Sequence, residues 1–314
     1  MTTKELKIPV ILGPTSTGKT GLALWLCKEF GGEIISADSR QIYKHMDIGT
    51  GKLPLGMASS IKRDAEFWEI EGVKIWGYDI VCPGEYYSAY DYALFALEKA
   101  KNNLSAGKTP FLVGGTGLYI DFFTHRIEGN SLPPDFNYRK KLEFQDLKDL
   151  QKTVMSLNLE VNNSDFQNKQ RLVRIIERNF PREKKSGTPL PYLQNSQFIF
   201  FGLTAPRDFL YDRADLWVDS IWKDDLLLDE VKKLNSMGFE NSPQLNGFIY
   251  NEAQKFIKGL TSKEEAIQRT KFNTHAYIRR QQTYFKKNTE INWFDISRDN
   301  WKQTIYNKLK DAGF

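Results

Sequence analysis

A glycine-rich octet near the N-terminus has the residue types needed to bind phosphate. It runs Gly13-Pro14-Thr15-Ser16-Thr17-Gly18-Lys19-Thr20 and fits the pattern G-x-x-x-x-G-K-S/T in full. Glycines let consecutive backbone N–H groups turn inward toward phosphate oxygens, and the lysine adds a positive charge. The hydroxyl of Thr20 can ligate magnesium. The octet therefore predicts a site for a di- or triphosphate, without naming the reaction.

Two further groups of residues follow apolar runs and could complete such a site. One is the segment 36–41 (SADSRQ), and the other is 114–117 (GGTG). Because the carboxyl ends of parallel strands meet at one edge of a sheet, we expect Asp38 to lie beside the octet. There it could act as a general base or as an indirect magnesium ligand, or it could simply cap the next turn. The glycines around Thr116 fit a close approach of backbone or ligand and a tight turn equally well.

The elements that must position these residues follow from the spacing of apolar side chains. Short apolar runs alternate with helical patterns, which is typical of a parallel α/β sheet. The expected strands span 8–12, 33–37, 73–81, 109–113 and 198–204, and the expected helices span 19–30 and 88–104, the latter with Ser88 as N-cap. We therefore expect an α/β fold of the P-loop NTPase type, in which a parallel sheet carries helices on both faces.

The chain changes character between two parts of this expected sheet. Residues 126–197 are polar, charged and mostly helical in pattern, and two consecutive prolines stand near the start of the stretch. We expect an inserted all-helical subdomain there. The first part of the core would then cover 1–125, and 198–314 would complete the core and add C-terminal helices.

Two groups of basic residues could bind nucleic acid. Arg171, Arg174 and Arg178 share one helical face, because they stand at i, i+3 and i+7. The second group comprises Arg279, Arg280, Lys286 and Lys287, with Tyr277, Tyr284 and Phe285 interleaved. Phosphate contacts from such faces would anchor an RNA stem. The alternative is a solvated helix face, which explains most basic stripes.

The composition narrows the class of protein. The formal net charge of +5 favours phosphate-bearing partners. Cys27 and Cys82 have no metal-ligand spacing, so a reducing compartment fits best. The N-terminus shows no secretory signal, and no apolar run approaches the ~20 residues of a membrane span. We expect a cytoplasmic protein with no membrane partner, and a monomer by default.

The motifs, taken in order, resemble the tRNA dimethylallyltransferase family, also called the tRNA isopentenyltransferase family. After the octet come SADSRQIYKHMDIGTGK (36–52), YDIVCPGEYYSAYDY (78–92) and VGGTGLYI (113–120). The pattern continues with QNKQRLVRIIE (167–177), LDEV (228–231), THAYIRRQQTYFKK (274–287) and WFD (293–295). The resemblance covers nearly the whole chain, and the combination of the first and third segments is highly specific.

The resemblance implies an activity. The enzyme would transfer a dimethylallyl group from dimethylallyl diphosphate to the exocyclic N6 amine of the adenine 3′-adjacent to the anticodon in tRNA, and diphosphate would be released. The octet would hold the leaving group, with Mg²⁺ as cofactor. The target base must leave its stack to reach such a site. The expected partners are therefore the anticodon stem-loop of tRNA and dimethylallyl diphosphate.

The resemblance also implies roles for individual residues. Gly13 to Thr20 and Arg213 would bind the diphosphate, with Thr20 as the metal ligand. The catalytic residues would be Asp38, the general base, with Lys19, Thr20 and Thr116. The tRNA-binding residues would be Asp38, Ser39, Arg40, Gln41, Thr116, Arg139, Gln170, Arg171, Leu172, Val173, Arg174, Arg279 and Arg280.

The chain departs from the family pattern at several positions. Trp217 stands where the pattern has a second arginine that the family uses near the diphosphate. The segment 248–252 reads FIYNE in place of I-G-Y-K-E, and Leu226 replaces a glycine before L-L-D-E-V. The expected helical subdomain is also short for the family.

Two other functions remain open at this point. A small-molecule or nucleotide kinase would use the same octet to hold ATP, but it would need neither Asp38 with Thr116 nor a basic inserted subdomain. An RNA-binding P-loop protein without transfer chemistry could arise through loss of the arginine at Trp217. ATP-dependent phosphorylation without tRNA would indicate the first, and tight tRNA binding without product the second.

Overall fold

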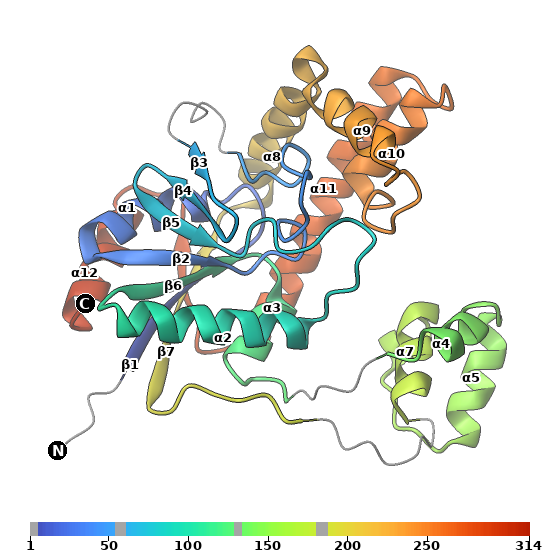
Figure 1. The fold of residues 1–314 in the computed structure, drawn as a ribbon, viewed down its shortest axis with the longest axis horizontal. Helices are drawn as coiled ribbons and strands as arrows, with labels where there is room; N and C mark the ends of the chain where they lie inside the picture. The colour runs from blue at the N-terminus through green and yellow to red at the C-terminus, as the bar shows by residue number, and fades with distance from the viewer. Residues whose placement is uncertain (1–5, 54–60, 129–133, 180–187) are drawn as a thin grey trace. The chain divides into compact units, whose positions relative to one another are not determined.

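The structure, a computed structural model, describes residues 6–53, 61–128, 134–179 and 188–314 (Figure 1). The chain divides into two compact units. The core unit comprises 1–127 and 191–314, and the helical unit comprises 128–190. The helical unit therefore begins and ends inside the range 126–197 that the sequence indicated for an inserted subdomain.

Within the described residues, eight strands of the core unit form one sheet in the order β3-β4-β5-β2-β6-β1-β7-β8. The strands are β1 (Leu6–Leu12), β2 (Gly32–Ser36), β3 (Ile61–Arg63), β4 (Phe67–Ile70), β5 (Val73–Trp76), β6 (Thr109–Gly114), β7 (Ser196–Thr204) and β8 (Asn292–Asp295). In this sheet order, every neighbouring pair from β5 through to β8 is parallel. Strand β4 pairs antiparallel with both β3 and β5. The central strand β1 sets Val10 opposite Leu112 on one side and Phe200 on the other.

Helices cover both faces of this sheet. The core unit contains α1 (Lys19–Phe30), α2 (Ala89–Ser105), α3 (Gly117–Phe123), α8 (Arg207–Trp222), the 3-10 turn η2 (Lys223–Asp225), α9 (Leu226–Ser236), α10 (Phe248–Ile257), α11 (Lys263–Phe285) and α12 (Trp301–Asp311). One core cluster joins Ile11 of β1 to Leu22 of α1 and to Ile305 of α12. Figure 1 shows α2 on the opposite face from α1.

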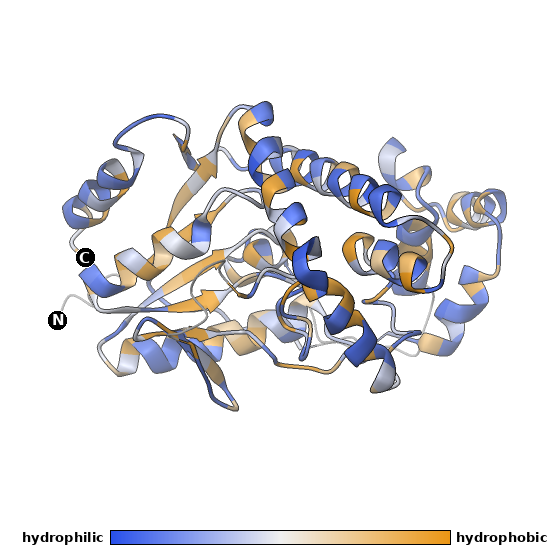
Figure 2. Ribbon diagram, turned by 90° about the horizontal axis from the view of Figure 1, so that it is seen from above, coloured by the Kyte–Doolittle hydropathy of each residue, from blue (hydrophilic) through white to orange (hydrophobic). Residues whose placement is uncertain are grey.

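The buried strands explain why the sheet forms where it does. Five consecutive residues at the end of β1 are buried, as expected for a strand covered on both faces. Figure 2 shows the strands as the most continuously hydrophobic segments, whereas the helices alternate between hydrophobic and polar faces. Helix α2 begins at the predicted cap, where Ser88 and Asp91 form a capping box. The predicted fold class is confirmed.

Two features of the sheet differ from the sequence prediction. The strand expected over 73–81 ends at Trp76, because Gly77 has a φ of 97° that only glycine adopts easily. The chain also adds the antiparallel strands β3 and β4 at one edge and β8 at the other. These short strands, one of three and two of four residues, give too brief an alternation to be recognised from periodicity alone.

The helical unit is built from α4 (Phe136–Glu143), α5 (Leu147–Ser156), α6 (Asn163–Phe166) and α7 (Lys169–Asn179). Asp135, Asp146 and Asn162 each accept a backbone hydrogen bond as N-cap of the helix that follows. The unit has its own small core, formed by Leu142, Leu150, Val154, Leu172, Val173 and Ile176. Across the described ranges, no helix is long and apolar enough to cross a membrane.

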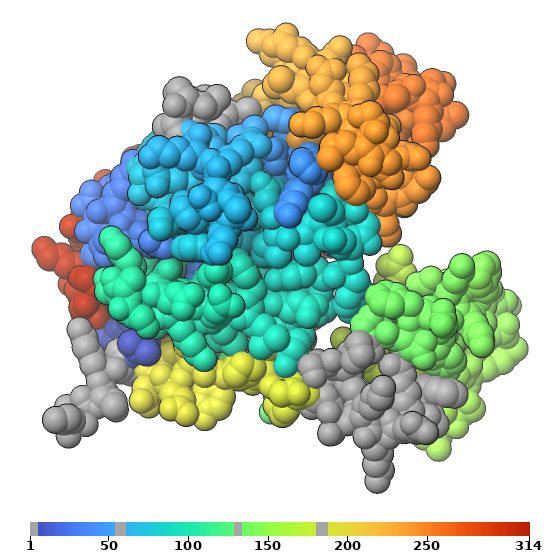
Figure 3. All heavy atoms as spheres, in the orientation of Figure 1, coloured from blue at the N-terminus to red at the C-terminus, as the bar shows by residue number. Residues whose placement is uncertain are grey.

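Helices α9 and α10 lie against the loop that follows β2. The space-filling view shows these helices in orange meeting blue residues of that loop (Figure 3). Hydrogen bonds join the two regions, among them one from the backbone N–H of Asp47 to Glu230 at 2.7 Å. Helices α9 and α10 therefore contact the loop that begins at the carboxyl end of β2.

Candidate functional site

A pocket of about 720 Å³ opens at the carboxyl ends of the central strands. Its walls come from the octet, the segment after β2, the end of β6, and helices α8, α10 and α11. The predicted site residues that line it are Thr15, Ser16, Gly18, Lys19, Thr20, Asp38, Ser39, Arg40, Gln41, Arg213 and Arg280. The crevice at the strand ends is where ligands bind in open α/β sheets.

The octet has the backbone geometry that the sequence predicted. Gly13 has a φ of 145°, and a Cβ atom there would come within 2.4 Å of the Leu203 carbonyl oxygen. Gly18 adopts the left-handed conformation and caps α1, so the helix N-terminus begins at Lys19. The Lys19 ammonium donates to the Pro14 carbonyl at 2.7 Å, and the Thr17 hydroxyl donates to the same oxygen at 2.8 Å. The loop is therefore closed on itself beside a positive helix end.

The protein environment makes Lys19 an unusual lysine. Burial lowers the pKa of Lys19 from 10.5 to about 8, and the carboxylate of Asp38 acts in the opposite direction. An anionic ligand in the pocket would favour the ammonium form in the same way as Asp38. The neighbouring Thr20 shares a side-chain hydrogen bond with the buried hydroxyl of Tyr78, whose pKa is raised by burial.

Helix α8 contributes Arg213 and Trp217 to the same wall. Arg213 donates from Nε to the Ser16 carbonyl at 2.8 Å, which fixes its guanidinium beside the octet. Trp217 follows one helical turn later and also lines the pocket, where its ring faces Gly51. An indole therefore occupies the place at which the family pattern has a second arginine.

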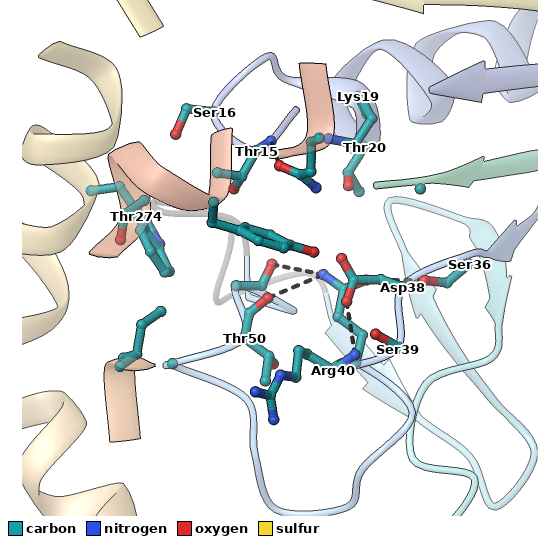
Figure 4. Close-up of a pocket in the computed structure, with 18 of the residues that line it drawn as sticks. Thr15, Ser16, Lys19, Thr20, Ser36, Asp38, Ser39, Arg40, Thr50 and Thr274 are labelled. Atoms are coloured by element: carbon teal, nitrogen blue, oxygen red, sulfur yellow. Dashed lines mark hydrogen bonds between the residues drawn. The ribbon is translucent and has the colours of Figure 1, made fainter. Parts of the chain in front are cut away.

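Asp38 faces the octet across the pocket (Figure 4). Its Oδ1 accepts a hydrogen bond from the Arg40 backbone N–H at 2.8 Å, so the turn-capping role that the sequence left open is present. The carboxylate nevertheless lines the pocket, and capping does not remove it from the site. Next to it, the Ser39 backbone N–H donates to Thr116 Oγ1 at 2.9 Å, and the two hydroxyl oxygens lie 3.2 Å apart. The structure therefore places Thr116 against Ser39, the residue that follows Asp38.

Close packing of protein atoms accounts for the glycines around Thr116. A Cβ atom on Gly114 would come within 2.1 Å of the Ala37 carbonyl oxygen. On Gly115 it would meet the Gln281 side chain at 2.5 Å, and on Gly117 the Tyr284 ring at 2.2 Å. Of the two explanations that the sequence left open, close approach of backbone and side chains explains these three glycines.

Two residues of α11 belong to the site although sequence reasoning gave them no role there. Gln281 accepts from the Thr15 backbone N–H at 2.9 Å and donates to the Gly115 carbonyl at 2.9 Å, so it ties the octet to the loop after β6. The hydroxyl of Tyr277 is hydrogen-bonded to Thr116, and burial together with the charge of Asp38 raises its pKa. Both residues lie in the family segment 274–287, which was the signal available in the sequence.

The two arginines predicted on α11 lie in different surroundings. Arg280 lines the pocket, with its guanidinium carbon 5.8 Å from the centre of the Tyr277 ring. Arg279 donates to the Tyr211 hydroxyl at 3.0 Å. Contact of either residue with RNA stays a prediction.

The predicted tRNA-binding residues of the helical unit divide into buried and exposed ones. Arg139 is buried and forms an ion pair with Glu177, whose Oε2 accepts from Nε at 3.0 Å and from Nη2 at 2.8 Å. Leu172 and Val173 belong to the core of the unit, so their side chains point away from solvent. Gln170, Arg171 and Arg174 are exposed on α7. The roles of all six toward RNA stay predictions.

Comparisons with known proteins identify the family of this chain. The family described as IPP transferase matches residues 41–288, and the one described as Isopentenyl transferase matches 6–63. A tRNA dimethylallyltransferase from Acetivibrio thermocellus is 35% identical over 96% of this chain and 95% of its own length. Another, from Streptococcus uberis, is 34% identical over 98% and 96%. The family resemblance drawn from the sequence is confirmed.

Solved structures are similar over the same length. The tRNA isopentenylpyrophosphate transferase of Bacillus halodurans has a TM-score of 0.70 and 31% identity, covering 98% of this chain and 96% of that one. The corresponding protein from Staphylococcus epidermidis has a TM-score of 0.68 and 28% identity, covering 98% and 100%. A eukaryotic dimethylallyltransferase acting on tRNA, 24% identical with a TM-score of 0.69, shares the fold. With the site geometry and these matches together, the chain belongs to the IPP transferase family.

Proposed function

We propose that this protein transfers a dimethylallyl group from dimethylallyl diphosphate to the N6 amine of the adenine 3′-adjacent to the anticodon in tRNA. The observation that carries the proposal is the pocket itself. A phosphate-binding octet and a carboxylate, Asp38, face one another across it in a chain of the IPP transferase family. One wall suits an anionic leaving group, and the other suits a nucleophile that must lose a proton.

The leaving-group end is formed by the octet and Arg213. In the reaction the bond between the allylic carbon and the diphosphate oxygen breaks, and the electron pair leaves with the diphosphate. Negative charge therefore grows on oxygens next to Lys19, Arg213 and the backbone N–H groups at the start of α1. Preorganised positive groups of this kind stabilise developing charge without reorganising during the reaction.

The acceptor end is formed by Asp38 and its neighbours. The adenine N6 forms the new bond to the allylic carbon, and one of its protons moves to the Asp38 carboxylate. The hydrogen bond from Arg40 N–H to Asp38 Oδ1 fixes the orientation of the carboxylate. Tyr277 lines the pocket, is hydrogen-bonded to Thr116 and feels the charge of Asp38, so its hydroxyl can bind a polar edge of an extruded base.

Magnesium fits this site as a companion of the diphosphate. In the described part of the chain, no group of three or more His, Cys, Asp and Glu side chains could hold a metal on its own. The Thr20 hydroxyl lines the pocket and is a hard oxygen donor of the kind that Mg²⁺ prefers. When bound with the diphosphate, the ion would neutralise part of the charge on the leaving group.

The same features favour prenyl transfer over the kinase alternative. Relatives that match nearly the whole chain are named tRNA dimethylallyltransferases. A small-molecule kinase would not need the exposed arginines of the helical unit, such as Arg171 and Arg174. We expect tRNA binding through exposed cationic residues, including Arg171 and Arg174, and a cytoplasmic, monomeric enzyme.

Identification of the product tests the proposed function. The purified protein is incubated with Mg²⁺, dimethylallyl diphosphate and an unmodified tRNA that has adenine 3′ of the anticodon, and the digested nucleosides are analysed by mass. The expected product is dimethylallyl-adenosine. Bound tRNA without product would overturn the transfer reaction, and phosphorylation of a small molecule with ATP would restore the kinase.

A further inference from the structure

A carboxylate outside the pocket holds one of the pocket walls. Glu230, on α9, accepts hydrogen bonds from three consecutive backbone N–H groups of the loop after β2. The donors are Asp47 at 2.7 Å, Ile48 at 2.7 Å and Gly49 at 3.1 Å. The Tyr250 hydroxyl donates a fourth bond at 2.8 Å. Four donors on one carboxylate are a strong anchor, because hydrogen bonds to an ionised acceptor are about twice as strong as neutral ones.

Glu230 does not line the pocket, and its carboxylate is hydrogen-bonded to the loop and to Tyr250. Burial raises the pKa of Glu230, and the hydrogen bonds from Ile48, Gly49, Tyr250 and Asp47 oppose that rise. The cost of burying a charge is therefore offset by the loop it holds. If the loop moved away, the carboxylate would lose its partners, so the two are stable only together.

The anchored loop forms the wall next to the acceptor segment. Gly49, Thr50 and Gly51 line the pocket. The carbonyl groups of Thr50 and Gly51 accept from Gln41 Nε2 at 3.3 and 3.4 Å, and Gln41 Oε1 accepts from the Ser36 hydroxyl at 3.0 Å. A chain of contacts therefore runs from Glu230 through the loop to Gln41, three residues after the carboxylate of Asp38.

Helix α10 and the residues before it hold the same region at two more points. A Cβ atom on Gly49 would lie 2.6 Å from the Tyr250 ring, so the ring packs directly on the loop backbone. Arg40 donates to the Gln244 carbonyl at 3.2 Å. Figure 3 shows the orange helices and the blue loop in contact on the surface. Glu230, Gln244 and Tyr250 therefore hold the acceptor wall in place, and we call this set of contacts with Arg40 and residues 47–49 the clasp.

We infer that Glu230 is a positioning residue for the acceptor side of the site. It holds loop 47–51 so that Gln41 and Asp38 keep the geometry in which the acceptor amine meets the donor carbon. The inference rests on the proposed function for the identity of the acceptor, while the clasp is defined by the contacts alone. Loss of the clasp should affect use of RNA and leave the diphosphate end intact.

The test uses Glu230→Gln in the full chain, because an amide of the same shape presents N–H groups to N–H donors. We measure kcat and KM for tRNA at saturating dimethylallyl diphosphate, the affinity for pyrophosphate, and amide exchange over 47–51. We expect kcat/KM for tRNA to fall about thirtyfold, since small misplacements near reacting groups are costly. Exchange at 47–49 should accelerate, and pyrophosphate affinity should stay within about twofold.

Matched variants separate positioning from general damage. Asp229→Asn removes the neighbouring carboxylate, whose side chain is 71% exposed, and should change none of the three readouts. Tyr250→Phe removes one of the four bonds and should lower kcat/KM about threefold. If Glu230→Gln does not fold, Gly49→Ala displaces the same loop from the Tyr250 ring and should give the same pattern.

Three outcomes would overturn the inference. They are unchanged exchange at 47–49, faster exchange with unchanged kcat/KM, and an equal loss of pyrophosphate affinity. If the unaltered protein makes no product at all, the proposed function fails instead. In that case the clasp is judged by amide exchange and tRNA affinity, both of which Glu230→Gln should still change.

Discussion

The octet and the acceptor segment face each other across one pocket, but they are held in different ways. Inside the octet, Thr17 and Lys19 both reach back to the Pro14 carbonyl, three and five residues away. The acceptor side depends on distant parts of the chain. Thr116 accepts a hydrogen bond from Ser39, which is 77 residues away in the sequence, and Glu230 accepts one from Asp47, which is 183 residues away. The octet therefore closes on itself and is also held by Gln281 and Arg213, whereas the loop after β2 depends on α9 and α10 for its position.

The largest expected effect breaks the acceptor end alone. Asp38→Asn keeps a side-chain oxygen for the Arg40 N–H but removes the base, so transfer should slow about a thousandfold. Affinity for tRNA and for pyrophosphate should change little, because the turn around Asp38 is preserved. Single-turnover kinetics with separate binding measurements check this. A loss of tRNA binding that accounts for the whole rate loss would contradict the role as general base.

The diphosphate end should respond to pH through Lys19. Its pKa of about 8 lies below the usual 10.5, so the buried ammonium destabilises the fold below pH 8, and this cost disappears as pH rises toward 10.5. Binding of pyrophosphate needs the ammonium form. Above pH 8 its affinity should therefore fall by up to about tenfold per pH unit, with proton uptake.

Calorimetry of pyrophosphate binding at several pH values measures that dependence. Lys19→Arg is the control, because a guanidinium stays charged throughout this range. The variant should flatten the pH profile even if its overall affinity is lower. An equally steep profile in Lys19→Arg would show that another group titrates.

The exposed arginines of the helical unit should matter for RNA and for nothing in the pocket. Arg171→Ala with Arg174→Ala removes side chains that are 58% and 46% exposed, each with an acidic partner inside the unit. We expect weaker tRNA binding and a salt dependence whose logarithmic slope is smaller by about 2. Pyrophosphate affinity should be unchanged. Equal tRNA affinity at low salt would mean that this face is only solvated.

The smallest expected effect concerns Trp217, at the border between the two ends. Trp217→Arg would place a second cation one helical turn from Arg213, on the wall that faces Gly51. We expect pyrophosphate to bind about threefold to tenfold more tightly, since an added ion pair in a partly closed pocket contributes about 1 kcal/mol. Weaker binding, measured by calorimetry, would show that the indole itself contributes to the donor site.

The difference between the two ends also explains what could be predicted from the sequence. Because the octet is a local pattern, its conformation, the strand before it and the helix after it could all be predicted from the sequence. Asp38 could be placed beside the octet because parallel strands end at one edge of the sheet. The partners that fix the acceptor side, Glu230 and Tyr250, could not be found by spacing, since they approach only when α9 and α10 fold back onto the loop.

Other parts escaped prediction for related reasons. The edge strands β3 and β4 are short, and the pairing of Trp68 with Ile75 depends on a sheet that is already formed. Gln281 links two loops of the site from near the C-terminal end of α11, a position that helical periodicity does not mark as functional. The family resemblance supplied the reaction, whereas the residues alone indicated a diphosphate site with a nearby carboxylate.

The most direct test of the account counts both products of the reaction in one experiment. The protein is mixed with Mg²⁺, dimethylallyl diphosphate and an unmodified anticodon stem-loop, and released diphosphate and dimethylallyl-adenosine are quantified together. If the octet and Asp38 act on the two halves of one transfer, the products appear in equal amounts and both disappear in Asp38→Asn. Diphosphate released without modified adenosine, or modification that persists in Asp38→Asn, would contradict it.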